Sequence, residues 1–435
     1  MKIQFLYFVS FVFGVLSTAW TPGVQDDTGN SPQNHEVTKI EVMDLEKILK
    51  KVFENNPSLF ASKAAIDEKK GAKTQARLFP NPQVFAEVED FSGTGAYSGT
   101  GAMSSRIGLE QPLLLGGKLK KRTKVAEMDL KISEIQHLVS IRDLTATVEK
   151  NFYAVFSAQE QLKVELEQLE LIKKTNWIVQ KRVTAGEVSP VDLLKSKVEI
   201  GSAEIQVAQS KKNLRSARKR LMALWGEKTD RPFTVLGKFR GSRDFPELSV
   251  GESLKQSPIW ALNEAKSQKV EAELLLEKAR RIPDLSLEGG LQRFNETDDR
   301  SFFLGVRLDL PVFNRNQGAI ATKKASVIKE KYLKEAEFNA FFSYLNTTWN
   351  DLSANKKALV VLETELVPAS KSAYKSMRKL YQAGEIDILP LVDAQRTWIK
   401  TQGNRIEILS LIETNIIEIQ RILGAIPSTQ ATIQE

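Results

Sequence analysis

The chain has 435 residues, of which 42% are hydrophobic and 27% charged, and this composition excludes both a disordered chain and a polytopic helical membrane protein. The formal net charge is +8, but the excess is spread over long Lys/Glu-rich stretches, which favours solvated helix faces over a nucleic-acid-binding stripe. The sequence contains no Cys, which excludes a disulfide framework, a thiolate metal site and a lipid-modified N-terminal cysteine.

Residues 1–19 predict a secretory signal peptide, because Lys2 precedes the almost wholly apolar stretch 3–16 and the small-x-small sequence 17–19 follows it. An uncleaved anchor is the alternative, but the apolar stretch is short for a membrane span. Residues 20–39 are rich in Pro, Gly, Asn and Asp and predict a flexible leader. No later run is long and apolar enough for a spanning helix, so we expect an exported chain that is periplasmic, secreted or held in the outer membrane by strands.

The rest of the chain contains an internal sequence repeat, with the two copies about 200 residues apart. Four short motifs recur in the same order: Asn56-Pro57 as Ser257-Pro258, 77–82 as 279–283, Gln111-Pro112 as Leu310-Pro311, and Ala185-Gly186-Glu187 as Ala383-Gly384-Glu385. The duplication predicts a first repeat over 40–226, a linker or equatorial segment over 227–249, a second repeat over 250–424 and a tail over 425–435. In the first repeat, a helix from about Asp44 is interrupted by Pro57 and continues to about Leu78.

Each repeat then contains a hairpin pattern, over 83–111 and over 284–310, in which apolar and polar residues alternate. Alternation of this kind over about ten residues is typical of a strand that lies between lipid and water. The alternative is an ordinary sheet packed on a helix. We disfavour it because two isolated hairpins in an otherwise helical chain have little sheet to join.

Long helices follow each hairpin, over 117–184 and 318–382, and shorter helices return over 190–225 and 390–423. Each long helix would span roughly 100 Å if continuous, with a kink expected at Pro368. A 3–4 spacing predicts coiled-coil seams at Leu345, Trp349, Leu352, Leu359, Leu366, Ala373, Met377 and Leu380, and at Ile399, Ile406, Leu409, Ile412, Ile416, Ile419 and Leu423. A soluble periplasmic coiled-coil scaffold would explain the helices, but it leaves both hairpins unexplained.

Four membrane-type strands cannot close a barrel alone, since the smallest single-chain barrels have about eight. An open edge in lipid would leave backbone groups without hydrogen bonds. We therefore expect several chains to share one barrel, with twelve strands from three chains, and the helices to continue it as a long tube. The predicted fold class is mainly α with a small β part.

Several motifs make the chain recognisable: Pro80-Asn81-Pro82, 87–91 (EVEDF), Leu109-Glu110-Gln111-Pro112, Leu115-Gly116-Gly117-Lys118, 310–318 (LPVFNRNQG) and 393–397 (DAQRT). Over roughly 40–424 the sequence resembles the TolC-like outer-membrane efflux proteins, most of all the heavy-metal branch typified by the cobalt–zinc–cadmium resistance component. The resemblance implies a homotrimer with a 12-stranded barrel in the outer membrane and a periplasmic α-helical barrel. It also implies docking onto a periplasmic adaptor that couples the tube to an inner-membrane pump. The channel would be a passive exit duct rather than an enzyme, and it would export heavy-metal cations; a drug efflux or type I protein secretion duct is the alternative.

The resemblance also assigns candidate site residues at the periplasmic tip. It makes the two Gly turns the adaptor contacts, that is, Ala185, Gly186, Glu187, Ala383, Gly384 and Glu385, although a turn with no partner is the structural alternative. Asp393 matches a position at which family members place a ring-forming acid at the tip constriction. Asp192 is a second gate candidate, but it also suits an acid at a helix start. Pro390 stands where another Asp is common, so the expected acidic ring is single.

Other signals in the sequence resemble chemical sites without the residues those sites need. The Gly-rich stretch 93–101 and Gly116-Gly117-Lys118 both lack the full phosphate-loop pattern. His35 and His137 have no partners at metal-ligand spacing. We therefore predict no catalytic residue, no cofactor and no metal site.

Overall fold

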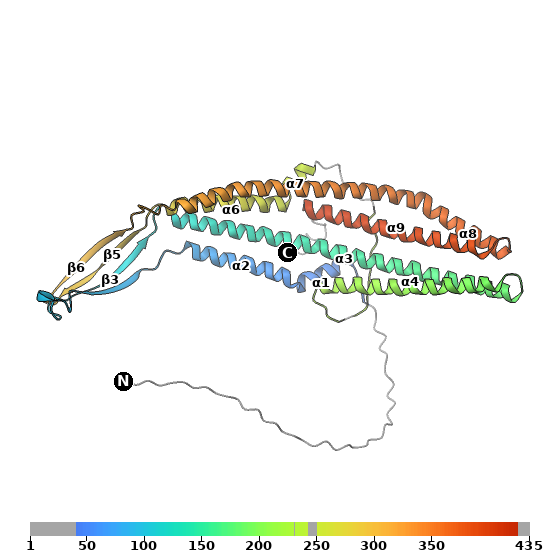
Figure 1. Ribbon diagram of the computed structural model, residues 1–435, viewed down its shortest axis with the longest axis horizontal. Helices are drawn as coiled ribbons and strands as arrows, with labels where there is room; N and C mark the ends of the chain where they lie inside the picture. Colours follow the sequence, from blue (N-terminus) through green and yellow to red (C-terminus); the bar gives the residue numbers. More distant parts are fainter. Residues whose placement is uncertain (1–40, 230, 242–249, 425–435) are drawn as a thin grey trace, which may run out of the picture. The chain divides into compact units, whose positions relative to one another are not determined.

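The computed structural model describes residues 41–229, 231–241 and 250–424 (Figure 1). The predicted signal peptide, the leader, the tail and part of the 227–249 linker lie outside the described residues. The described part is mainly helical with two small sheets, as the sequence predicts. Within it, no helix is both long enough and apolar enough to cross a membrane.

Asparagine and serine caps begin the helices that lead into the sheet. Asn56 separates α1 (Leu45–Asn55) from α2 (Pro57–Arg77), and its side chain accepts hydrogen bonds from the backbone N–H groups of Ser58 and Leu59. The Asn56 amide also donates to the carbonyl oxygen of Leu224 at 2.7 Å. In the second half, α5 (Val250–Lys255) precedes α6 (Pro258–Arg280), and Ser257 caps α6 through the backbone N–H of Trp260. Both caps precede a proline at the first helical position, where its missing N–H has no cost.

The two predicted hairpins form one antiparallel four-stranded sheet in the order β2-β3-β5-β6. The strands are β2 (Gln83–Glu89), β3 (Ser104–Leu113), β5 (Leu285–Phe294) and β6 (Asp299–Leu308), with a short 3₁₀ turn, Gly95–Tyr97, between the first two. The hairpins join through β3 and β5, where Gly108 lies opposite Gly290. The sequence did not predict this pairing.

The register separates the side chains of this sheet into an apolar and a polar face. Aligned residues such as Ile107, Leu291 and Phe302 share one face across three strands. This face is uncovered: Phe302 is 88% exposed and Leu304 85% exposed. Exposed apolar side chains at these positions fit contact with lipid, because such a surface would be unfavourable in water.

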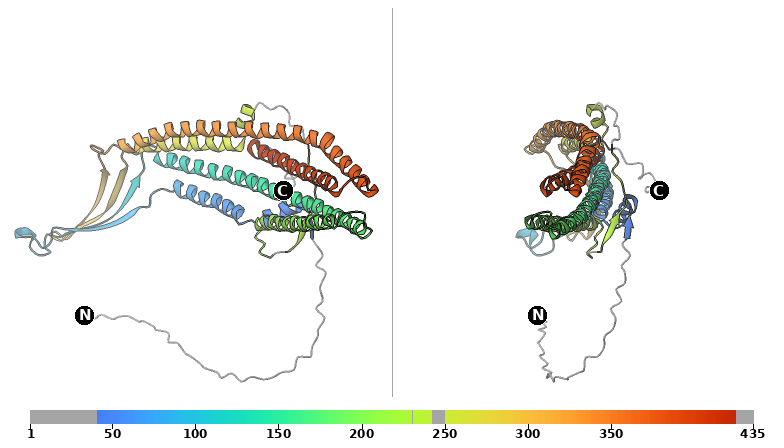
Figure 2. Two further views of the ribbon diagram at one scale, coloured as in Figure 1. Left: turned by 45° about the vertical axis from the view of Figure 1, so that its right-hand side comes forward. Right: turned by 90° about the vertical axis from the view of Figure 1, so that its right-hand side faces the viewer.

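Long helices extend from the sheet. They are α3 (Lys118–Thr184), α4 (Pro190–Ala223), α7 (Gln317–Val361), α8 (Val367–Ala383) and α9 (Ile388–Leu423). Helix α3 packs against α2 and α6 along its first part and against α4 and α9 along its second part, while α9 packs against α7 and α8 (Figure 2). With 67 residues, α3 is about 100 Å long.

The kink expected at Pro368 is a π-helical turn, Leu362–Leu366, between α7 and α8. Pro368 has no N–H to donate and its ring would clash with the carbonyl four residues earlier, so a wider turn accommodates it. The extra residue shifts the coiled-coil seam. The prediction was correct for Leu345, Leu352 and Leu359, which are buried, but wrong for Leu366 and Ala373 beyond the π turn, which are exposed. Tyr374 and Tyr381 are buried beyond the turn instead, and the predicted residue Met377 is half-buried against the cluster that contains them.

A second, two-stranded sheet lies at the middle of the helical part. Strand β1 (Glu41–Met43) pairs in parallel with β4 (Phe233–Val235), and Phe233 and Val235 are buried in a core with α1, α3 and α4. Strand β4 falls in the segment 227–249, which the sequence predicted as a linker or equatorial segment without a strand. A three-residue strand is too short to show period-two alternation, so the sequence carried no signal for it.

The chain after β4 is held by a buried charge. The Arg240 guanidinium donates to Glu413 of α9 at 2.8 Å and to Glu149 of α3 at 3.2 Å, and it lies over the ring of Tyr153. Glu413 is 0% exposed and Glu149 only 3% exposed. Burial alone would lower the pKa of Arg240, but the two carboxylates outweigh it and the pKa is raised.

A glycine turn joins β3 of the sheet to helix α3. Gly116 and Gly117 have φ of +67° and +69°, and a Cβ on Gly116 would lie 2.7 Å from the Ile282 side chain. Asp284 accepts from the Leu115 backbone N–H at 2.9 Å and pairs with Lys118 at 2.8 Å. The motif Leu115-Gly116-Gly117-Lys118 of the first repeat is therefore held in place by Ile282 and Asp284 of the second repeat.

Candidate functional site: the helical tips and the polar face of the sheet

The two predicted tip turns have the same backbone hydrogen bonds. After α3, the N–H of Glu187 donates to the carbonyl of Arg182 at 2.9 Å and that of Gly186 to Val183 at 3.0 Å. After α8, Glu385 donates to Leu380 at 3.0 Å and Gly384 to Tyr381 at 3.1 Å. These are Schellman turns, and the positive φ of Gly186 (+74°) and Gly384 (+81°) explains why glycine is needed. All six residues of the predicted turns are exposed, including Ala185 and Ala383.

Arg182 connects the two turns. Its guanidinium pairs with Glu187 of its own turn at 3.1 Å and donates to the carbonyl oxygen of Tyr381 at 2.9 Å. It also lies 5.1 Å from the centre of the Tyr381 ring. Burial raises the pKa of Tyr381; the Arg182 cation opposes this shift, and Asp192 and Asp387 add to it. The structure thus brings the two predicted turns together through a residue that the sequence analysis did not single out.

The two predicted gate acids have different surroundings. Asp192 lies in the first turn of α4, is 18% exposed and pairs with Lys195 at 3.3 Å. This is the position of an acid that stabilises a helix start. Asp393 is exposed on α9 and has no hydrogen bond or ion pair to any described residue.

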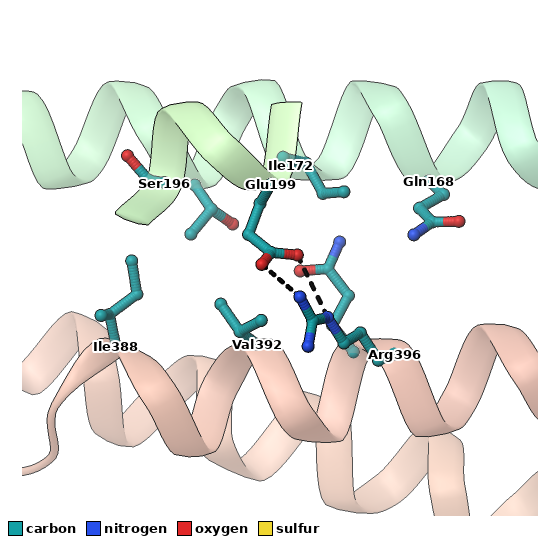
Figure 3. Close-up of a pocket in the computed structure, with 9 residues that line it drawn as sticks. Gln168, Ile172, Ser196, Glu199, Ile388, Val392 and Arg396 are labelled. Atoms are coloured by element: carbon teal, nitrogen blue, oxygen red, sulfur yellow. Dashed lines mark hydrogen bonds and ion pairs between the residues drawn. The ribbon is translucent and has the colours of Figure 1, made fainter. Parts of the chain in front are cut away.

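A small cleft lies between the α3–α4 pair and α9, close to the tips (Figure 3). Arg396 of α9 forms a bidentate ion pair with Glu199 of α4 across its mouth. The cleft has room for about one water molecule, 20 Å³, and the buried amide nitrogen of Gln395 has no hydrogen-bond partner in the described chain. This volume is too small for an organic substrate to bind inside the cleft.

Arg182, Tyr381, Glu199 and Arg396 were missed for one reason. Each of these contacts joins residues that are far apart in the sequence. Arg182 and Tyr381 are separated by 199 positions, and Arg396 and Glu199 by 197 positions. A weak signal existed, because Arg182 and Glu187 flank the Gly turn with opposite charges. Nothing in the sequence indicated the partner on α8.

The polar face of the large sheet carries an excess of acids. The register places Glu87, Glu89, Glu110, Glu288 and Asp299 on this face, against the two arginines Arg106 and Arg307. Arg106 pairs with Glu87 at 2.9 Å, and Arg307 pairs with Glu110 at 3.0 Å and Glu288 at 3.1 Å. Glu89 and Asp299 have no ion pair within the described residues, so this face has a negative net charge.

The described residues contain no cluster of three or more His, Cys, Asp or Glu that could hold a metal ion. His137 instead shares a hydrogen bond of 2.7 Å with Ser62, between α3 and α2. His35 lies outside the described residues.

The chain was compared with known protein families and structures. The family model described as "Outer membrane efflux protein" matches residues 48–227 and 250–425. The cobalt-zinc-cadmium resistance protein CzcC of Cupriavidus metallidurans is 30% identical over 87% of this chain and 90% of that protein. The cation efflux system protein CusC of Escherichia coli O157:H7 is 24% identical over 87% of this chain and 85% of that protein.

Solved structures show the same fold. The crystal structure of CusC matches with a TM-score of 0.76 at 17% identity, over 87% of this chain and 91% of that chain. VceC of Vibrio cholerae matches with a TM-score of 0.74 at 16% identity, over 87% and 96%. Because the family model matches most of the sequence, the chain belongs to the outer membrane efflux protein family, as a non-enzymatic outer-membrane channel of a tripartite efflux system with a periplasmic helical part.

Proposed function

We propose that this channel is the exit duct for divalent heavy-metal cations. The excess of acids on the polar face of the sheet carries the proposal, because a pore lined by carboxylates favours cations. The printed names of similar proteins, cobalt-zinc-cadmium resistance and cation efflux, support the same substrate class. Tight metal sites would slow release, and a duct needs none.

The proposed working unit is a homotrimer, with the domain plan of two repeats behind a cleaved signal peptide. Strands β2 and β6 are the free edges of the sheet, and pairing each edge with a neighbouring chain would close a twelve-stranded barrel. Helix α4 exposes an apolar stripe with coiled-coil spacing, made by Val191, Leu194, Val198 and Ile205. A second copy that covers this stripe would remove it from water.

In this proposal the exposed tip turns, 185–187 and 383–385, dock onto a periplasmic adaptor, which connects the channel to an inner-membrane pump. All residues of the two turns are exposed, so a partner can contact them without unfolding the tip. Glu187 is already engaged by Arg182, whereas Glu385 has no ion pair in the described part of the chain. Glu385 is therefore the freer of the two acids for a partner.

Deletion of the gene is expected to lower resistance to zinc, cobalt and cadmium, and a plasmid copy should restore it. Growth inhibition by metals and by hydrophobic drugs is measured in parallel, together with export of a type I secreted protein from the same strain. Loss of drug resistance or protein export with unchanged metal resistance would reject the metal assignment and favour the alternative duct. A strain that expresses the Glu296→Gln variant, altered only in the exposed β5–β6 turn, serves as the matched control.

The gate is proposed to contain Asp393, with the Arg182 contact holding the two tip turns together. Three Asp393 carboxylates around a threefold axis would bind cations and narrow the passage. Asp192 is a weaker candidate, because its carboxylate is engaged by Lys195.

Asp393→Ala is expected to raise the conductance of the reconstituted channel and to weaken its block by divalent cations, since the ring would lose its charge. Single-channel currents in planar bilayers measure both quantities. Glu407→Ala removes another exposed acid of α9, farther from the tip, and should change neither. Unaltered conductance together with unaltered block would remove Asp393 from the gate.

A further inference from the structure

Basic residues gather where the sheet meets the helices, and both halves of the chain contribute them. On the helix ends in this region, six exposed cations have no ion pair within the described residues: Arg77, Lys120, Lys124, Lys278, Arg281 and Lys324. We call these six residues the basic collar. Its members come from the end of the helix that precedes each hairpin and from the first turns of the long helix that follows it.

The collar lies just beyond the membrane-facing strands. Helix α3 begins at Lys118, five residues after β3 ends at Leu113. Lys120 and Lys124 lie within about 10 Å of the first residue of the helix. Arg281 precedes β5 by four residues. Figure 1 shows the strand-side ends of α3, α6 and α7 next to one another. The polar headgroup layer extends about 5–8 Å beyond the hydrocarbon on each side. The long side chains of Lys and Arg can extend along the helix surface toward this layer.

Three collar residues line a groove at the start of α3. Arg77, Lys120 and Lys124 share it with Lys121, whose amine already donates to the carbonyl oxygen of Gly116 at 2.6 Å. The single acid in the groove, Glu127, pairs with Lys73 at 3.4 Å. The groove therefore presents positive charge that nothing in the described chain neutralises.

Exposed aromatic residues flank the collar. Phe79 is 70% exposed between Arg77 and β2, and Phe313 is 91% exposed between β6 and α7. Aromatic side chains at this level are typical of the membrane interface, where an apolar ring meets polar headgroups. The combination of rings and unpaired cations distinguishes this surface from an ordinary solvated helix face.

We propose that the basic collar binds anionic phospholipid headgroups of the periplasmic leaflet of the outer membrane. The location follows from the family, whose channels sit in that membrane, and the charge and the flanking rings match a phosphate-bearing surface. A nucleic acid would not lie at this boundary, and a protein partner would have to enter the headgroup layer. Each basic residue near an anionic surface contributes about a fivefold gain in binding.

The test uses the full-length protein, purified in detergent and mixed with phosphatidylglycerol or phosphatidylcholine of the same chain length. Native mass spectrometry counts the lipids retained. We expect a preference for phosphatidylglycerol, and we expect the Arg77→Gln/Lys120→Gln/Lys124→Gln variant to lose at least about tenfold of it. Lys197→Gln/Lys211→Gln/Lys212→Gln removes three exposed cations from α4, away from the sheet, and should keep the preference.

Equal retention of both lipids by the unaltered protein would overturn the proposal, as would an undiminished preference in the Arg77 triple variant. If that variant fails to assemble, the unaltered protein is measured at low and high salt, because headgroup binding by unpaired cations weakens when charges are screened. A preference that salt leaves unchanged would also overturn the proposal. Neither result bears on the transported substrate.

Discussion

Gly290→Ala is expected to abolish assembly of the four-stranded sheet. A Cβ on Gly290 would lie 2.1 Å from the carbonyl oxygen of Ile107 and 2.6 Å from the Cα of Gly108. Both atoms belong to the backbone of β3, so no side-chain rotation can relieve the clash. Strands β3 and β5 would have to separate, and each backbone hydrogen bond lost there costs about 1 kcal/mol or more. We expect at least about a tenfold fall in assembled protein in outer-membrane fractions.

The neighbouring glycine provides the control. Gly289→Ala places its Cβ on the opposite, apolar face, 3.4 Å from the Phe303 carbonyl oxygen and 3.5 Å from Leu304. These distances leave only a slight adjustment, so the variant should assemble. If the Gly290→Ala variant assembled in the outer membrane to the same amount as the unaltered protein, β3 and β5 would not pair as described.

Arg240→Met is expected to destabilise the middle of the helical part by about 3–5 kcal/mol, because the buried carboxylate of Glu413 would lose its cation and that of Glu149 would lose one of its partners. Glu413 and Glu149 are 0% and 3% exposed, so water cannot replace the guanidinium. Loss of helical circular dichroism in urea measures the effect on the purified protein. The double variant Arg240→Met/Glu413→Gln should recover a large part of the loss, because it removes the carboxylate charge that is fully buried beside the lost guanidinium.

An exposed ion pair of α9, the helix that carries Glu413, provides the control. It shows how much stability is lost when an ion pair is broken without burying a charge. Arg405 of α9 pairs with Glu363 at 2.7 Å, and the two side chains are 39% and 43% exposed. Arg405→Met should cost less than about 1 kcal/mol. Equal losses for Arg240→Met and Arg405→Met would contradict the role of burial.

The long helices and the four strands of the large sheet are encoded locally, and for that reason the sequence predicted them. Alternation marks the four strands, and Pro57, Pro190 and Pro258 mark helix starts. The pairing of β3 with β5 was not predictable, since it depends on two glycines far apart in the chain that permit close backbone approach. The π turn was not predictable either, because a proline inside a helix indicates distortion but not its form.

The candidate site likewise contains some features that the sequence predicted and others that it could not predict. The Gly turns follow from a conformation that glycine alone adopts freely, so the sequence locates them. The Arg182 contact and the buried Arg240 pairs join distant segments, and a charged residue in a sequence rich in charge gives no hint that it is buried. The role of Asp393 rests on an arrangement of several chains, which one chain cannot display.

The π turn has a mechanical consequence for a tube made of several chains. Helix α3 runs from the sheet to its tip turn without interruption, whereas the path through α7 and α8 contains one widened turn. In a closed ring of three chains, rigid rods would alternate with rods that have a weak point at the same height. Bending would then concentrate at three positions around the circumference, so the free end would widen with threefold rather than sixfold symmetry.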